Sequence, residues 1–385
     1  MKKKCILCKD DNLEIFFSLE KFPLFFGAVD KNYIDQVPRY DLDMSYCKKC
    51  GHVQQTNLID EEIMNSVYTA EYYNCPSPSC SDIGEREILK FYDFFKRSKL
   101  KKGVLMEVAC FDGFLLNLLN KDGWDIYGCD PATQTDIALD KFGKNKIKKE
   151  FLSKNTFQNK KFDVIIFRNL LEHIYDINGF IELISSILTE NGSIFIDLPN
   201  VNTTEDYGGY GLFFHQHISY FSIDTMKYFL DKNNFHVVNY FEGSPNLFIH
   251  AKKNKDKSEI KNFTKFNPNK LISRNKDISE RIIFFLKSEK NISFFGASAL
   301  ATTILCKIDD DVKLNVKKIY DNEKIKHDKI LQGTDITISN PNTITNSDDT
   351  KFLITSFFFD NEIYEQLINQ GINQNKIIKI NSLLK

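Results

Sequence analysis

The sequence predicts an α/β protein in three parts, in which a small cysteine-containing domain precedes two units of alternating strands and helices. Two Cys-x-x-Cys pairs stand within the first 50 residues. From Gly103 onward, short apolar runs alternate with amphipathic stretches, which is typical of a doubly wound parallel sheet. The same alternation resumes near Ile292, after a polar stretch rich in Lys, Asn and Asp.

Composition restricts the kind of protein. The chain has 385 residues, enough for two or three domains, and 42% are hydrophobic, so a sizeable core can be buried. Lys and Arg total 51 against 52 for Asp and Glu, which leaves no overall basic charge for binding nucleic acid. No apolar run has membrane-spanning length, and none follows the basic start as in a signal peptide. We therefore expect a cytoplasmic protein without nucleic-acid or membrane partners, whose oligomeric state the sequence does not fix.

The first domain, expected over residues 1–70, is predicted to bind a structural zinc ion. Cys5 and Cys8 form one pair, and Cys47 and Cys50 form the other. Four thiolates supply tetrahedral ligation, and each two-residue spacing lets one tight turn direct two sulfurs at one ion. Four protein ligands leave no open position for chemistry. A redox-active cysteine pair is the weaker alternative.

The middle domain is expected over residues 71–255. Apolar runs bounded by turn residues predict buried strands, and amphipathic stretches predict helices. The predicted strands are Val104–Ala109, Asp125–Cys129, Phe162–Phe167 and Ser193–Asp197, and the predicted helices are Ile83–Lys96, Phe114–Asn120 and Gly179–Leu188.

The polar stretch Lys252–Lys276 predicts a linker into a second α/β domain, expected over residues 256–385. Its predicted strands are Ile292–Phe295, Val316–Tyr320, Phe352–Ser356 and Ile377–Ile380. One helix follows Gly296-Ala-Ser-Ala and ends at Cys306, and another covers Asn361–Gln370.

The turn Glu107–Phe114, between the first strand and helix of the middle domain, predicts a ligand site. Gly113 lets a ligand approach the backbone closely. Because the turn has one glycine, a pyrophosphate cradle is disfavoured. Asp130 ends the next strand, where a carboxylate can accept hydrogen bonds from both hydroxyls of a ribose. The alternative is a generic α/β domain with acids at its strand ends by chance.

The segment Phe213–Ser222 is the densest cluster of polar and aromatic residues. Three glycines just before it imply a loop. His215 and His217 would lie on one face if the segment were extended. An imidazole in a cleft can act as a general base near neutral pH. The alternative is a histidine pair that satisfies backbone groups.

These motifs, together with Asn169-Leu170-Leu-Glu-His173 after the third predicted strand, resemble those of class I S-adenosylmethionine (SAM)-dependent methyltransferases. Over essentially the whole chain, their order resembles the C-methyltransferases that act on nucleotide-linked 4-keto deoxysugars. The resemblance implies a class I methyltransferase Rossmann-like core that binds SAM, flanked by a zinc-binding domain and a C-terminal Rossmann-like domain. The two outer domains would enclose the nucleotide-sugar.

The resemblance also implies residue roles. His217 would remove the proton beside the ketone, so that an enolate attacks the methyl group, and His173 or the backbone would polarise the oxyanion. His215 would orient the loop or contact the sugar. The expected catalytic residues are His217 and His173, and the substrate-binding residues are Tyr72, Tyr73, His215, Gln216, Tyr220, Ser298 and Asp321. The expected cofactor-binding residues are Glu107, Ala109, Asp112, Gly113, Phe114, Asp130, Asn169 and Leu170, and the zinc ligands are Cys5, Cys8, Cys47 and Cys50.

Two departures from the family pattern affect the expected reaction. Family members usually have Tyr-His-Glu-His, whereas this chain has Phe214-His215-Gln216-His217, so an amide replaces the carboxylate before the base. A carboxylate would raise the basicity of a histidine, whereas an amide can only orient it. The segment Ala299–Thr302 also lacks the family's usual lysine and glycine. The resemblance still implies methyl transfer to carbon. The departures leave O- or N-methyl transfer to a similar sugar, or a non-catalytic sugar-nucleotide-binding module, as alternatives.

Overall fold

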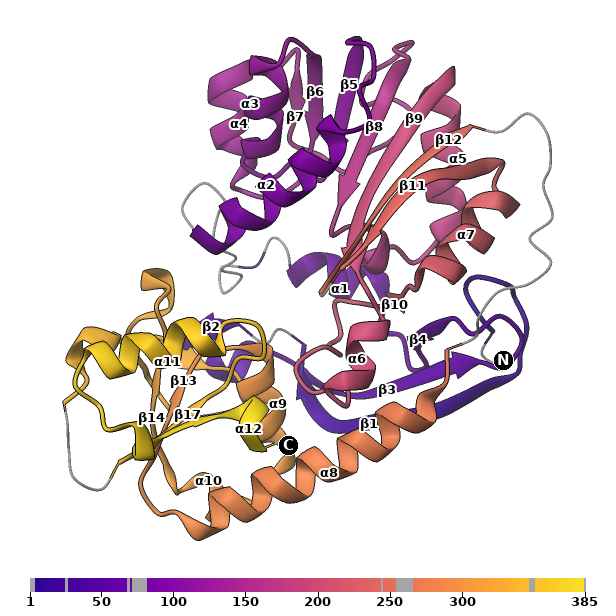
Figure 1. The fold of residues 1–385 in the computed structure, drawn as a ribbon. Coiled ribbons are helices and arrows are strands. Elements are labelled where there is room, and N and C mark those ends of the chain that lie inside the picture. Colours follow the sequence, from indigo (N-terminus) through magenta and orange to yellow (C-terminus); the bar gives the residue numbers. More distant parts are fainter. Residues whose placement is uncertain are drawn as a thin grey trace.

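The computed structural model describes residues 4–24, 27–67, 70, 82–243, 245–253, 266–345 and 350–383. These residues form an N-terminal sheet, a middle domain around the largest sheet and a C-terminal domain (Figure 1). The predicted fold class, two α/β units after a cysteine-containing domain, is confirmed.

The N-terminal part contains a four-stranded antiparallel sheet whose longest strands the sequence did not reveal. Register shifts between Ile15 and Phe17 and between Leu19 and Phe22 break the alternation of buried and exposed residues in its first strand. The last strand comes from the middle of the chain, so the sheet joins two distant segments. In spatial order the strands are β1 (Leu13–Pro23), β3 (Arg39–Cys47), β4 (Val53–Gln55) and β10 (Ser219–Tyr220), accompanied by η1 (Lys31–Gln36) and α1 (Glu61–Val67).

The middle domain is built on a seven-stranded sheet, in which five parallel strands continue into an antiparallel pair at one edge. All four predicted strands are present. The first ends one residue early because Ala109 adopts a left-handed conformation with φ 59°. In spatial order the strands are β11 (Phe235–Glu242), β12 (Asn246–Lys253), β9 (Leu188–Pro199), β8 (Phe162–Arg168), β5 (Val104–Val108), β6 (Asp125–Cys129) and β7 (Ile147–Lys148).

Helices cover both faces of this sheet. Along β8, Val164 and Ile166 pack with the helices of one face, and Ile165 and Phe167 pack with those of the other. The doubly wound arrangement expected from the sequence is thus confirmed. The helices are α2 (Asp82–Lys96), α3 (Phe114–Lys121) and α4 (Thr135–Phe142) on the first face, and α5 (Ile177–Ile187) and α7 (Ile223–Lys232) on the second. The short helices η3 (Leu171–His173) and α6 (Asn202–Asp206) follow β8 and β9.

The antiparallel edge pair β11 and β12 was not predicted. Most residues of β11 are exposed or half-buried, so the strand has no continuous apolar run. An edge strand of this kind gives little signal in sequence.

The C-terminal domain is the expected second α/β unit, and its parallel sheet has the four predicted strands and one more, β16 (Ile338–Ser339). Its strands in spatial order are β16, β14 (Val316–Tyr320), β13 (Ile292–Phe295), β17 (Lys351–Ile354) and β18 (Ile377–Lys379), and β15 (Ile330–Leu331) pairs with β2 (Ala28–Val29) of the N-terminal part. Its helices are α9 (Ala299–Lys307), α10 (Asp310–Lys313), α11 (Asp360–Asn369) and α12 (Ile380–Leu383), with η4 (Lys324–Lys326), η5 (Pro341–Thr343) and η6 (Gln374–Lys376).

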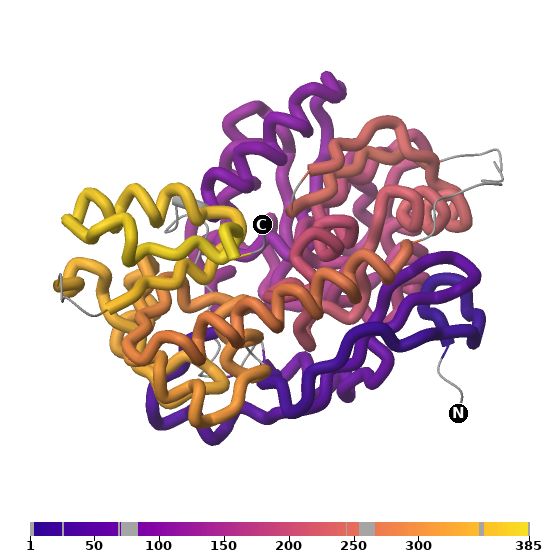
Figure 2. Tube along the Cα trace, turned by 60° about the horizontal axis from the view of Figure 1, so that its bottom comes forward, coloured from indigo at the N-terminus to yellow at the C-terminus, as the bar shows by residue number. Residues whose placement is uncertain are grey.

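The linker predicted over Lys252–Lys276 is wrong at both ends, because β12 extends to Lys253 and the long helix α8 (Pro268–Ser288) begins inside it. The Asn267 side chain caps this helix, and a proline occupies its first turn. Apolar residues at helical spacing face the core, while the polar solvent face gave the stretch its linker-like composition. Residues 254–265 lie outside the described ranges. Helix α8 runs alongside β1 and α6 before it enters the C-terminal domain (Figures 1 and 2).

In the described ranges of the chain, no helix combines the length and the apolar character that crossing a membrane requires.

Candidate active site and metal centre

The four predicted zinc ligands come together at the N-terminal sheet. The Sγ atoms of Cys5 and Cys50 lie 3.6 Å apart, as do those of Cys8 and Cys47, and all four lie within 4.8 Å of one another. Tetrahedral zinc with Zn–S bonds of about 2.3 Å requires sulfur separations of about 3.8 Å. Hydrogen bonds from the neighbouring thiols, that of Cys5 first, lower the pKa of Cys47 and favour the thiolate that binds metal. The donor set fits a structural zinc ion.

The zinc-binding turns pack against the middle domain. Cys5, Cys47 and Cys50 belong to the same apolar cluster as Met226 and Phe229 of α7. Folding of the cysteine turns and packing of α7 are therefore coupled.

Gln55, the last residue of β4, holds the histidine-containing segment 213–218, here called the His loop. Its Nε2 lies 3.1 Å from the carbonyl oxygen of Phe214, 2.7 Å from that of His215 and 2.8 Å from that of His217. Directly after the loop, β10 pairs with β4. The N-terminal sheet thus determines the conformation of the His loop, and no sequence signal had indicated Gln55.

The two histidines of the loop point in different directions, because the loop is a turn and not an extended segment. The N–H group of His217 donates to the carbonyl of Phe214 (3.1 Å). The Nε2 atom of His215 lies 3.2 Å from the carbonyl oxygens of Phe22 and Tyr40, in the N-terminal sheet, and its ring is buried. The segment is therefore not extended, so the condition for a shared face is not met, and the loop that the preceding glycines implied is present. Of the two roles expected for His215, these contacts fit the orientation of the loop.

His217 instead lies against the end of β8, where His173 and Glu172 are found. The rings of His173 and His217 meet edge to face with centroids 4.7 Å apart. Glu172 Oε1 lies 3.9 Å from His217 Nε2. The backbone N–H of Ile218 donates to the carbonyl of Glu172 (2.8 Å), which ties the two segments together.

Burial sets the protonation of this cluster. Loss of solvent lowers the pKa of His173 to about 4 and that of His217 well below its usual range, so both rings are neutral near neutral pH. Burial also raises the pKa of Glu172 to about 8. Neither carboxylate oxygen of Glu172 has a hydrogen-bond partner among the described residues. The position of Glu172 beside the predicted His173 was the sequence signal that could have identified it.

The predicted cofactor turn follows β5 at the carboxyl edge of the sheet. Ala109, Phe111 and Gly113 all have positive φ angles, of 59°, 49° and 74°. A Cβ atom at Gly113 would lie 2.9 Å from that of Ala138, so a side chain is excluded there. The Asp112 side chain accepts from the N–H of Phe114 (2.9 Å) and stabilises the turn. This geometry leaves the backbone of the turn close to any bound ligand.

Two acids flank the cofactor turn. The carboxylate of Asp130 accepts from the N–H groups of Phe111 (3.1 Å) and Ala132 (2.8 Å), and burial raises its pKa. Burial raises the pKa of Glu107 to about 8, and its Oε2 has no hydrogen-bond partner among the described residues. A buried carboxylate lacking a partner fits the charged methionine end of SAM. Asp130 retains acceptor capacity for a ribose.

Asn169 and Leu170 complete this edge directly after β8. The N–H of Asn169 donates to the carbonyl of Asp197 (2.8 Å), and its side chain is exposed. The predicted cofactor residues thus gather at the carboxyl ends of β5, β6 and β8, where doubly wound proteins bind ligands.

The predicted substrate residues of the C-terminal domain are engaged within that domain. Ser298 caps α9 and donates to the carbonyl of Thr355 (2.9 Å). Asp321 accepts from the N–H of Ala297 (2.8 Å) and from Lys326 Nζ (3.0 Å). The backbone contact repeats the one that Asp130 makes in the middle domain, but here a lysine neutralises the acid.

The remaining substrate predictions have different outcomes. The hydroxyl of Tyr220 donates to the carbonyl of Leu212 (2.9 Å), and the buried ring packs inside the His loop. Gln216 is buried in the same loop. Tyr72 and Tyr73 lie outside the described residues.

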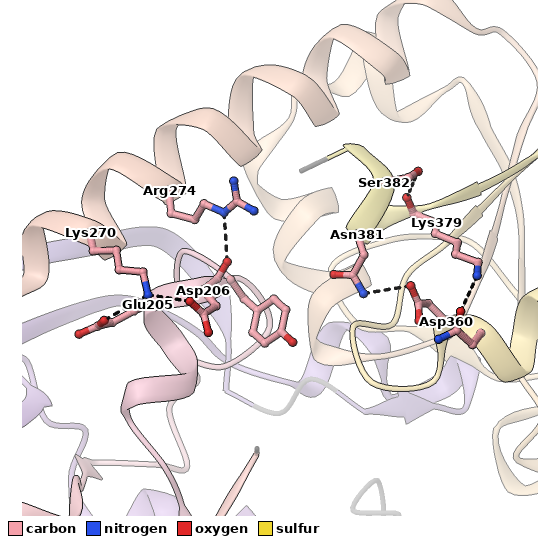
Figure 3. A pocket seen from close by; sticks show the side chains of 10 residues that line it. Glu205, Asp206, Lys270, Arg274, Asp360, Lys379, Asn381 and Ser382 are labelled. Carbon is pink, nitrogen blue, oxygen red and sulfur yellow. Dashed lines mark hydrogen bonds and ion pairs between the residues drawn. The ribbon is translucent and has the colours of Figure 1, made fainter. Parts of the chain in front are cut away.

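A hollow of about 790 Å³ separates α6 and α8 from the C-terminal end of the described chain (Figure 3). Lys270 pairs with Asp206 (2.7 Å), and Arg274 donates to the carbonyl of Asp206 (3.1 Å). Because the cations lining the hollow (Lys270, Arg274 and Lys379) are matched by the carboxylates of Glu205, Asp206 and Asp360, it has no excess positive charge for a diphosphate.

Three family models match the chain in sequence order. A zinc binding domain matches residues 5–64, a methyltransferase domain matches 83–240, and a C-methyltransferase C-terminal domain matches 224–379. Among curated proteins, the chain is 22% identical to the C-methyltransferase NovU of Streptomyces niveus over 61% of this chain and 56% of that protein. It is 36% identical to a ubiquinone biosynthesis O-methyltransferase of Pelagibacter ubique over 28% of this chain and 48% of that protein. The chain therefore spans about half the length of these curated relatives.

Solved structures with similar folds include the magnesium protoporphyrin IX methyltransferase of Synechocystis, with 14% identity, 51% of this chain and 98% of that chain covered, and a TM-score of 0.37. A protein from Pyrococcus horikoshii has 16% identity, 48% and 99% coverage, and a TM-score of 0.39.

Proposed function

Since the chain belongs to the SAM-dependent methyltransferases and has the three-domain architecture of the C-methyltransferases, we propose that it methylates a carbon atom of a nucleotide-activated keto or deoxy sugar. The product would serve the cytoplasmic biosynthesis of a polysaccharide or glycoconjugate. One observation carries the proposal: the His loop brings His217 against His173, directly after the strand end that borders the cofactor turn. The match to a C-methyltransferase C-terminal domain supports carbon as the acceptor.

In this proposal His217 is the general base. Bound SAM supplies an electrophilic methyl group. His217 removes the proton from the carbon beside the ketone, so that the C–H bond breaks and the electron pair forms an enolate. The enolate carbon then forms the new C–C bond as the sulfur–methyl bond breaks. The lowered pKa of His217 keeps the ring neutral and able to accept this proton.

His173 would position His217 rather than polarise the oxyanion. A hydrogen bond joins the His173 ring to the backbone of Gln216 and partly offsets the effect of burial on its pKa. A neutral imidazole has one N–H group, so the other nitrogen is an acceptor. Stabilisation of the enolate oxygen therefore falls to backbone N–H groups near the site.

A second candidate function is O-methyl transfer to a similar sugar. The similarity to an O-methyltransferase at 36% identity over 116 residues favours it, and so does the amide at Gln216. Transfer to a hydroxyl needs deprotonation of oxygen only, for which a weaker base is sufficient.

The test is incubation of the purified protein with SAM and nucleotide-linked 4-keto sugars, followed by NMR of the product. Carbon methylation gives a C–CH₃ resonance, and the carbon beside the ketone exchanges its proton with solvent deuterium. An O–CH₃ resonance without exchange would establish the second candidate. Binding of SAM by calorimetry with no turnover of any sugar would indicate a non-catalytic module.

A further inference from the structure

A carboxylate lies beside His217 although the sequence places an amide at Gln216. It belongs to Glu172, in the short helix η3 that follows β8. Its Oε1 lies 3.9 Å from His217 Nε2, and the side chain of Glu172 is 1% exposed. Neither oxygen has a hydrogen-bond partner among the described residues. A buried carboxylate in this state is costly and calls for a functional explanation.

The backbone holds this pair in place from both sides. The carbonyl of Glu172 accepts from the N–H of Ile218, directly after His217. The carbonyl of His217 in turn accepts from Gln55. Hydrogen bonds thus hold the backbone of both segments and keep the two side chains beside each other.

On the basis of the proposed function, we propose that Glu172 is the acidic partner of His217 and supplies the charge that Gln216 cannot. When the imidazole of His217 takes the proton from the acceptor, its new positive charge is shared by both ring nitrogens and lies beside the Glu172 carboxylate. The C–H bond of the acceptor breaks, an N–H bond forms on the imidazole, and the electron pair remains on the acceptor as the enolate. After methyl transfer the proton leaves His217 for solvent. Glu172 touches no reacting atom and is a positioning and charge-balancing residue.

Electrostatics supports the pairing. Burial penalises either charge alone, which is why the pKa of Glu172 is raised and that of His217 is lowered. An ionised glutamate beside an imidazolium has no net charge and escapes much of this penalty. The pair therefore titrates as a unit, and its active form is ionised Glu172 with neutral His217.

The other ionisable groups that face Glu172 and His217 do not supply a negative charge for the imidazolium of His217. Asp197 faces Glu172, but it forms an ion pair with Arg168 (3.1 Å). His173 faces His217, and Tyr220 faces Glu172 with its pKa raised by burial, so both are neutral near neutral pH.

The experiment compares Glu172→Gln with the double variant Glu172→Gln/Gln216→Glu, using Glu182→Gln, an exposed residue of α5, as the matched control. Glu172→Gln keeps the side-chain volume and is expected to lower kcat by about 10²-fold with unchanged SAM affinity. The acid limb of the pH profile of kcat/KM should move to lower pH, because loss of the carboxylate lowers the pKa of the imidazolium. The double variant should recover at least about tenfold in kcat, and the control should match the wild type.

Three results would overturn the inference. One is a Glu172→Gln variant with wild-type rate and pH profile. Another is a loss of rate with an unmoved acid limb and no recovery in the double variant, which indicates a structural role only. The third is a second metal ion per chain that is lost in Glu172→Gln, because Glu172, His173 and His217 could also ligate a cation.

Failure of the proposed function gives a different result. If wild-type product NMR shows O–CH₃ and no C–H exchange, carbon methylation is wrong. A moved acid limb in Glu172→Gln would then still establish the pair, with a hydroxyl as the source of the proton.

Discussion

The side-chain amide of Gln55 lies 2.8 Å from the carbonyl oxygen of His217, across 162 residues of sequence. Gln55 belongs to the N-terminal sheet, which also contains Cys47, whereas His217 is the proposed base at the edge of the methyltransferase sheet. The zinc-binding part of the chain thus contacts the backbone of the His loop, and through it would influence the proposed reaction.

Replacing Gln55 with Ala should therefore impair catalysis more than cofactor binding. The carbonyls of Phe214, His215 and His217 would lose the shared donor, at a cost of about 1–3 kcal/mol in the free energy of unfolding. We expect kcat to fall by about tenfold or more with SAM affinity unchanged, since small misplacements of a base are costly. Calorimetric titration, denaturant unfolding and kinetics measure the three effects. Gln36→Ala, an exposed glutamine of the same domain, is the control, and an equal loss of SAM affinity and rate would contradict this role.

Zinc removal should act through the same connection. The purified protein is expected to contain about one zinc per chain, and Cys5→Ser or Cys47→Ser should release it and destabilise the N-terminal part. Metal analysis and thermal unfolding measure this. Cys306→Ser, outside the cysteine cluster, should keep its zinc. Protein purified without chelator that contains no metal would refute the site.

The strands that could be predicted from the sequence are those in which nearly every residue is buried. Val104–Val108 and Phe162–Arg168 are covered on both faces, so they appear as apolar runs. Strand β1 has a bulged register, and β11 is a mostly exposed edge strand, so neither gives a clean period. The helix α8 resembles a linker because its solvent face is polar.

Site residues could be predicted from the sequence where they directly follow a strand, because the end of the strand places them at one edge of the sheet. Gly113 and Asp130 follow consecutive parallel strands, so they had to share one edge of the sheet. The contacts of Gln55 and the burial of Glu172 depend on how the His loop packs on a distant sheet, and no local pattern encodes that packing.

Asp130→Ala should weaken SAM binding by about 1–3 kcal/mol, because two ribose hydroxyls would lose their acceptor. The substitution also removes the acceptor for the N–H groups of Phe111 and Ala132. Asp136→Ala, an exposed acid of α4, is the control for charge. Calorimetric titration, under conditions in which wild type and variant are both folded, measures the change in SAM affinity. An unchanged affinity would place the cofactor elsewhere. Binding of NAD in place of SAM would contradict the inference drawn from the missing glycines.

His250 should make stability depend on pH. Its ring stacks on Phe195 at 4.2 Å and lies 3.2 Å from Ser193 Oγ, and burial lowers its pKa to about 4. The unfolded chain, with a histidine pKa of about 6.5, binds a proton more readily than the folded protein. The neutral His250 ring therefore contributes its full share to the free energy of unfolding above pH ~6.5, and this contribution is lost as the pH falls toward 4. At about 1.4 kcal/mol per pH unit, the loss is at most about 3 kcal/mol. Denaturant unfolding between pH 7 and 4 should show a shallower slope for His250→Gln than for the wild type, and equal slopes would contradict this assignment.

His217→Ala is the central test of the proposed reaction. The ring is largely buried against His173 and Phe214, and burial lowers its pKa, so the imidazole is neutral and able to accept a proton near neutral pH. We expect kcat to fall by about 10²–10⁴-fold with nearly unchanged SAM affinity, since in the proposed reaction the histidine would contact the acceptor and not the cofactor. Exchange of the acceptor C–H with solvent deuterium should vanish in the same variant. Gln216→Glu should raise the rate only if base strength limits turnover. Near-full activity of His217→Ala, or a wild type without exchange, would exclude the enolate and leave O- or N-methyl transfer as the reaction.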